Sequence, residues 1–125
     1  MSLSAHARSA LLALHRALVE RERRDYEKIH GRVSDGDFLQ GLIHDPAFAW
    51  LTPFTTLIVR LEELDDEGNE ADAAAALAAL RELLILAPER SEFHRTYAER
   101  VDRDPDVAVA HGVAVTQIRQ AQAPQ

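Results

Sequence analysis

Residues 53–69 read PFTTLIVRLEELDDEGN, and this stretch decides the fold class. Its large apolar residues recur at intervals of three and four, which places them on one face of an α-helix. The residues of that face are Phe54, Leu57, Ile58, Leu61 and Leu64. Gly68 can end this helix and Asn69 can cap the next one, with Asp72 three residues later as in a capping box. The stretch therefore predicts an amphipathic helix followed at once by a second helix.

Two helices and a corner are predicted before that stretch. The first helix covers residues 4–30 and ends at Gly31, which can adopt the left-handed conformation of a helix terminus. A short helix follows over residues 37–44. The chain then turns at Asp45-Pro46, where Asp caps a new helical turn and Pro occupies its first position. The second half of the first helix is mostly charged, so we expect its far end to contact little of the core.

Three more helices are predicted from residue 70 onward. Residues 70–87 form a helix that is apolar nearly all round and that Pro88 ends, which is typical of a central or interfacial helix. Ser91 caps a fifth helix. The sixth, over residues 106–120, contains valines that partly alternate as they would in a strand. We expect a helix there, because other apolar residues fit the 3.6-residue spacing and no partner strand is predicted.

The sequence as a whole therefore predicts an all-α protein with a single domain, a helical bundle of four main helices plus one or two short ones. The chain has 125 residues, of which 46% are hydrophobic and 28% are charged, as in ordinary globular domains. We expect the bundle to span residues 1–120 and to be built on the first, third and fourth helices. Residues 121–125 are expected to form a flexible tail.

The charge and hydropathy of the chain argue against two classes of partner. The net charge is −7, whereas nucleic-acid binding needs a cationic surface, so no nucleic-acid partner is expected. No apolar run reaches the ~20 residues that span a bilayer, so no membrane partner is expected. The chain contains no cysteine and shows no export signal, which fits a cytoplasmic protein. The basic excess within residues 1–32 is expected to pair with acidic helices of the same bundle or of a dimer mate.

Two segments resemble a known family. They read LHRALVERERRDYEKIHG at residues 14–31 and FLQGLIHDPAFAWLTPFTTLIVRLEEL at residues 38–64. Both are similar to a family of small uncharacterised bacterial proteins marked by an L(L/I)HDPxFAWLxP segment that leads into a helix. The resemblance implies no catalytic, cofactor or binding residue, because the family has no assigned activity. Thr52 and Thr56 stand where that pattern would have a basic and an acidic residue, so no charged site is expected at this corner.

The sharpest candidate for chemistry in the sequence is a metal site. Glu27 and His30 form an E-x-x-H pair, which points both side chains the same way on a helix and is used in di-iron bundles. His44 and Asp45 are adjacent near the corner and could join them if the loop folds back. No cofactor is predicted beyond a divalent metal at these residues. The alternatives are a solvated helix end for the first pair and helix capping for Asp45.

Aromatic residues cluster around the corner. Phe48, Trp50 and Phe54 could anchor a protein partner, because Trp and Phe are frequent in binding hot spots. The alternative is that they plug the end of the bundle. His15 and His111 each lie on an apolar stripe, and we expect them to be hydrogen-bonded histidines of the core.

These features favour a non-enzymatic interaction or regulatory protein that forms a homodimer. No catalytic motif is present, the first helix is longer than its neighbours can cover, and the fourth helix is too apolar for packing on one side only. The partner is expected to be a second copy of the chain or another protein. The alternative is a bundle that binds a metal or small molecule through Glu27, His30, His44 and Asp45.

Overall fold

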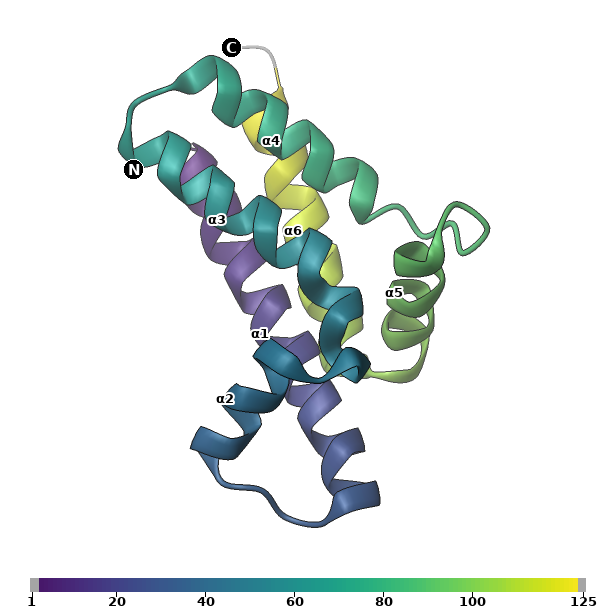
Figure 1. Ribbon diagram of the computed structural model, residues 1–125. Coiled ribbons are helices and arrows are strands. Elements are labelled where there is room, and N and C mark those ends of the chain that lie inside the picture. The colour runs from purple at the N-terminus through teal and green to yellow at the C-terminus, as the bar shows by residue number, and fades with distance from the viewer. Residues whose placement is uncertain (1–2, 124–125) are drawn as a thin grey trace.

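The computed structural model describes residues 3–123, which form helices joined by short loops (Figure 1). No strand is present in this part of the chain, so the prediction of an all-α protein is confirmed. The elements are α1 (Leu3–His30), α2 (Asp35–His44), the 3₁₀ helix η1 (Pro46–Leu51), α3 (Thr52–Asp66), α4 (Glu70–Leu83), α5 (Glu92–Arg103) and α6 (Pro105–Gln122). None of these helices combines the length and the hydrophobicity that crossing a bilayer requires.

Four helices form the bundle, one more than the three expected to build its core. α1 packs most extensively on α6, and α3 packs on α4 (Figure 1). The two pairs join where α1 meets α3 and where α4 meets α6. The helix that the prediction left out of the core is α6. It can approach α1 closely because it buries the small Ala114 between Val107 and Ile118, with all three side chains inaccessible to solvent.

The core is one cluster of apolar side chains from the bundle helices. Leu11, Leu14 and Leu18 of α1 are fully buried, as their helical spacing predicts, and they belong to the same cluster as Phe54 of α3. Each such side chain contributes about 1.5–3 kcal/mol by leaving water. α2 buries only Phe38 and lies outside this cluster, so it is peripheral to the bundle.

Side-chain caps set where most of the helices begin. Ser34 accepts a hydrogen bond from the amide of Asp37, so α2 begins at Asp35, two residues earlier than predicted. The starts of η1, α4, α5 and α6 are capped in the same way by Asp45, Asn69, Ser91 and Asp104. Gly31 and Gly68 follow α1 and α3 with φ angles of 82° and 72°, the left-handed conformation in which glycine ends helices.

α4 ends at Leu83, four residues before the predicted end at residue 87. Pro88 cannot continue a helix and disfavours the helical conformation of the residue before it, so the chain unwinds ahead of it. Leu84 turns into the core, whereas Ile85 and Leu86 remain 37% and 49% exposed. α4 buries one face only, and the apolar residues of its outer face are alanines. Within one chain α4 therefore packs on one side, and the packing of its alanine face against a second copy stays a prediction.

α6 is helical throughout, so the predicted helix is confirmed over its valine-rich segment. Val107 is buried while Val109 is exposed, because the two side chains lie on different sides of a helix. The helix runs to Gln122, two residues past the predicted end, so the first part of the expected tail is helical. Residues 124–125 of that tail lie outside the described residues.

The charged second half of α1 adds no residue to the apolar core cluster, as expected, but it forms polar contacts with other parts of the chain. Glu22 is buried, and its Oε1 accepts a hydrogen bond from Nε of Arg100 in α5 over 2.6 Å. Arg21 forms an ion pair with Asp25 and also lies 3.7 Å from Asp104 at the start of α6. Charged side chains can lie against the bundle here because each has a partner of opposite charge.

Candidate functional site

Glu27 and His30, the predicted metal ligands of α1, are engaged in local contacts. One carboxylate oxygen of Glu27 accepts a hydrogen bond from the amide of Val33 over 3.0 Å. The other oxygen lies 3.7 Å from Nε of Arg23. The His30 ring packs against the ring of Tyr26, with the two centroids 4.3 Å apart. Glu27 therefore fastens the loop that follows α1.

His44 and Asp45 lie at the junction of α2 and η1. Asp45 Oδ1 accepts a hydrogen bond from the amide of Ala47 over 2.9 Å, which is the capping role given as the alternative. His44 is exposed in the last turn of α2, near the negative pole of that helix. Among the described residues, no three His, Asp or Glu side chains are placed so that they could hold a metal ion. The structure does not bring Glu27, His30, His44 and Asp45 together as a metal site.

The aromatic corner points inward. Phe54 is fully buried and Phe48 is 4% exposed, so neither can anchor a partner on the surface. Trp50 is half-buried, with its ring 5.5 Å from the ring of Phe93 and 5.7 Å from the guanidinium of Arg100. Phe48 and Phe54 are therefore not exposed anchors, although Phe48 lines the pocket described next, and Trp50 packs within its own chain. These large apolar side chains instead plug the end of the bundle.

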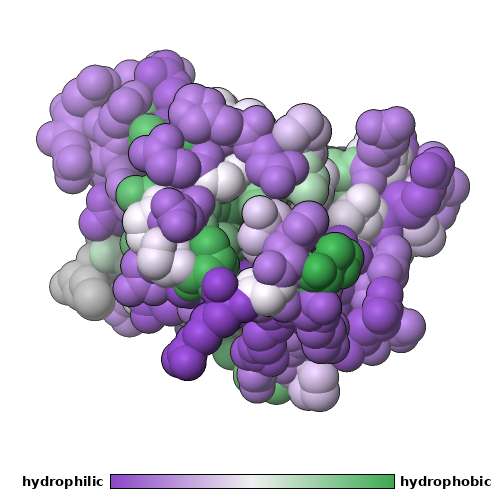
Figure 2. All heavy atoms as spheres, turned by 60° about the horizontal axis from the view of Figure 1, so that its bottom comes forward, coloured by the Kyte–Doolittle hydropathy of each residue, from purple (hydrophilic) through white to green (hydrophobic). Residues whose placement is uncertain are grey.

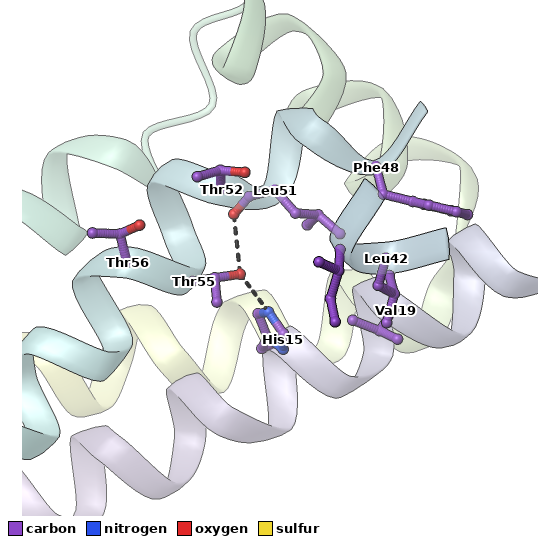
Figure 3. Close-up of a pocket in the computed structure, with 9 residues that line it drawn as sticks. His15, Val19, Leu42, Phe48, Leu51, Thr52, Thr55 and Thr56 are labelled. Carbon is purple, nitrogen blue, oxygen red and sulfur yellow. Dashed lines mark hydrogen bonds between the residues drawn. The ribbon is translucent and has the colours of Figure 1, made fainter. Parts of the chain in front are cut away.

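A pocket of 250 Å³ opens beside this plug, between α1, α2 and the start of α3 (Figure 3). We call it the α1–α3 pocket, and its lining residues are His15, Val19, Leu42, Ile43, Phe48, Leu51, Thr52, Thr55 and Thr56. The side chains that line it are mostly apolar. Its polar side-chain groups are one imidazole and three threonine hydroxyls, and no Asp, Glu, Lys or Arg takes part in the lining.

Two hydrogen bonds link His15 to the backbone of η1 through Thr55 (Figure 3). Thr55 Oγ1 lies 3.2 Å from the carbonyl oxygen of Leu51, which can accept its hydrogen. Nε2 of His15 lies 2.8 Å from the same hydroxyl oxygen, and which of the two groups donates depends on the tautomer of the imidazole.

The surroundings of His15 keep its ring uncharged. Burial lowers the pKa of His15 below its ordinary value of 6.5, because an apolar environment disfavours the charged form. The ring of Phe54 lies beside it, with a distance of 5.7 Å between centroids. The polar groups of the pocket thus include a neutral imidazole that is hydrogen-bonded to a threonine hydroxyl.

Exposed apolar residues border the α1–α3 pocket. Leu39 and Ile43 lie one turn apart on α2 and are 55% and 64% exposed. Leu12 of α1 and Val59 of α3 continue the seam between these two helices and are 42% and 47% exposed. We call the pocket and these four residues the α2 patch. In Figure 2, which brings the α2 end of the molecule forward, hydrophobic atoms gather near the middle of the view among hydrophilic ones.

Some residues of the α2 patch could have been predicted from the sequence, and others could not. Leu39 and Ile43 are an apolar pair four residues apart on a helix that buries only Phe38, which is a readable signal of an exposed apolar face. His15 and Thr55 are 40 residues apart, so no local pattern links them. The pocket between them exists only because α1 and α3 pack together.

Comparisons with family models, with curated proteins and with solved structures gave no match for this chain. The resemblance of residues 14–31 and 38–64 to a bacterial family therefore stays a prediction. Inferences about function rest on the geometry of the chain itself.

Proposed function

We propose that this protein is a non-enzymatic interaction protein that forms a homodimer through the α2 patch. The observation that carries the proposal is that this surface has both an apolar ridge, made by Leu39 and Ile43, and a pocket beside it whose mostly apolar lining contains no charged side chain. A twofold dimer needs a surface that is complementary to itself, because each copy presents the same residues to the other. The ridge of each copy can enter the pocket of the other copy.

The α1–α3 pocket fits side chains better than it fits a small-molecule ligand. Ligand sites usually have volumes of about 300–1,000 Å³ and a few converging polar groups. This pocket has 250 Å³, and two of its polar groups, His15 and Thr55, are already bonded to each other. An aliphatic side chain needs no polar partner, so a leucine or isoleucine suits it.

Burial of the ridge supplies part of the free energy that a dimer needs. Complete burial of a leucine or isoleucine contributes about 1.5–3 kcal/mol. Leu39 and Ile43 each still have more than half of their surface exposed, at 55% and 64%. Twofold symmetry doubles the gain, because both copies bury both residues. Burying the exposed parts of these four side chains contributes roughly 4–7 kcal/mol before the cost of association, so a micromolar dimer, which needs about 8 kcal/mol, also has to bury Leu12, Val59 and the lining of the pocket.

The test is the molecular mass as a function of concentration, measured by sedimentation or light scattering. The wild-type chain is expected to change from monomer to dimer across the micromolar range. Ile43→Glu places a charge in the centre of the contact and should weaken the dimer by more than about 100-fold, because an unpaired buried charge costs several kcal/mol. Ile43 is 64% exposed in one chain, so the monomer should stay folded.

Val109→Glu is the matched control. Val109 is 68% exposed on α6 and lies outside the α2 patch, so the same change in charge there should leave the dimer intact. A wild-type chain that stays monomeric across the micromolar range contradicts the proposal. A dimer that survives Ile43→Glu but is broken by Val109→Glu would place the interface on α6 instead.

A further inference from the structure

A second hollow lies between α4 and α6 and shares no lining residue with the α1–α3 pocket. We call it the α4–α6 groove. The last turns of α4 and the chain that follows it form one wall, and α6 forms the other. The volume of the groove is 580 Å³, which is in the range of small-molecule sites.

A buried tyrosine sets the hydrogen-bonding character of the groove through His111. Tyr97 is fully buried, and its hydroxyl lies 2.6 Å from Nδ1 of His111, which lines the groove. Burial raises the pKa of Tyr97 and lowers that of His111, so both are uncharged at neutral pH. The hydroxyl has no other acceptor in the described part of the chain, so it donates to Nδ1 and leaves the ring hydrogen on Nε2. His111 thus offers the groove an N–H donor.

Two guanidinium groups line the groove without a carboxylate partner among the described residues. Arg119 has no ion pair or hydrogen bond there, and Arg81 donates to the amide oxygen of Gln122 over 2.9 Å. The one carboxylate that lines the groove, Glu82, is bound to Arg90 over 2.9 Å. Both arginines lie near helix ends and offset the negative helix poles, a role that leaves N–H groups available. The groove is therefore rich in donors and poor in acceptors.

We propose that the α4–α6 groove binds a small organic carboxylate with an apolar body. The carboxylate binds between Arg81 and Arg119, because arginine holds carboxylates by paired, charge-assisted hydrogen bonds. Leu84 and Val115 belong to the apolar walls that contact the body of the ligand. His111 lies about two turns of α6 from Arg119, or ~12 Å along the helix axis, so its Nε2 would donate only to a ligand that carries a second oxygen at that distance from the carboxylate.

Calorimetric titration of the full chain with octanoate tests this site, with octanol and acetate as comparison probes. Octanoate is expected to bind saturably, once per chain, because it has both the charge and the apolar body. Octanol lacks the charge and acetate lacks the body. Each should therefore bind at least about tenfold more weakly than octanoate.

Substitution of the two arginines separates a built site from adsorption to apolar surface. Arg81→Gln and Arg119→Gln should each weaken octanoate binding by about tenfold, the loss expected for one charge-assisted hydrogen bond. Arg60→Gln removes an exposed arginine of α3 outside the groove and should leave the affinity unchanged. All three positions are exposed, so the variants should fold, which thermal denaturation checks.

Three results would overturn the site. They are the absence of saturable octanoate binding at millimolar concentration, octanol binding as tight as that of octanoate, and an equal loss of affinity in all three variants. Each would leave the proposed dimer untouched, because the dimer is tested by molecular mass and uses other residues.

Discussion

At the scale of single residues, Glu22 shows how charge is used inside this bundle. Its side chain is 7% exposed, and its partner Arg100 holds its guanidinium 5.7 Å from the centre of the Trp50 ring. The pair joins α1 to α5 across 78 residues of chain. A buried carboxylate is stable only when it is paired and hydrogen-bonded, because water would otherwise stabilise it better. The charged end of α1 is therefore tied to the bundle by a specific contact.

Glu22→Gln should lower the free energy of unfolding by about 2 kcal/mol. The loss is smaller than the roughly 3–5 kcal/mol of a fully buried pair, because the Arg100 side chain is 19% exposed and water compensates part of its charge. Denaturation in urea measures it. Glu20→Gln, at an exposed position of α1, should change the stability by less than about 0.5 kcal/mol. Equal effects of the two substitutions would show that the buried pair adds nothing specific.

At the scale of elements, the start of α6 is a helix terminus whose capping carboxylate is buried. Asp104 is 3% exposed, and its Oδ1 accepts hydrogen bonds from the amides of Asp106 and Val107 over 2.9 and 3.3 Å. Its other oxygen lies 3.7 Å from the guanidinium of Arg21. α6 makes the most extensive contact with α1, so its first turn positions the largest helix interface of the fold.

Asp104→Ala should destabilise the protein by about 2 kcal/mol, the upper end of the range for losing an N-cap, because this cap is buried. Asp104→Asn is the matched control, since Asn caps as well as Asp but removes the charge that faces Arg21. We expect it to keep most of the stability in chemical denaturation. An Asn variant as unstable as the Ala variant would mean that the ion pair, and not the cap, stabilises this turn.

At the scale of the whole molecule, a four-helix bundle carries α2 and η1 at one end (Figure 1). α2 contacts mainly η1, and its buried residue is Phe38. The Phe38 ring meets the Phe48 ring edge-on at 5.5 Å, and the guanidinium of Arg23 lies 5.0 Å from its centre. Few buried apolar contacts are typical of segments that open before the whole protein unfolds.

Hydrogen exchange should therefore show α2 opening at a free energy at least about 2 kcal/mol below that of α1 and α6. The experiment uses the Ile43→Glu variant, which is expected to be monomeric, because the proposed dimer would cover α2 and slow its exchange. Comparison with the wild-type chain at high concentration then reports the protection that the dimer adds. Amides of α2 that exchange as slowly as those of α6 in this variant would contradict the expected order.

The helices could be predicted because their signals are local. A cap such as Ser91 or Asp104 bonds to amides two or three residues away, and an apolar stripe repeats within one helical turn. The end of α4 was placed four residues too late, because the apolar residues after Leu83 continue the pattern although the helix does not. The candidate site was less predictable. The proposed ligands at Glu27, His30, His44 and Asp45 do not converge, and the residues of the α1–α3 pocket were not linked by any spacing.

The sequence by itself determined that this chain is helical, where most helices begin and which face of each turns inward. Only the tertiary structure decided which faces meet: that α1 lies on α6, that Glu22 is buried against Arg100, and that His15 meets Thr55. The physical reason is that hydrophobic burial is non-directional, so an apolar stripe suits any other apolar stripe equally well. The choice among them rests on side-chain volumes and paired charges that lie tens of residues apart in the chain.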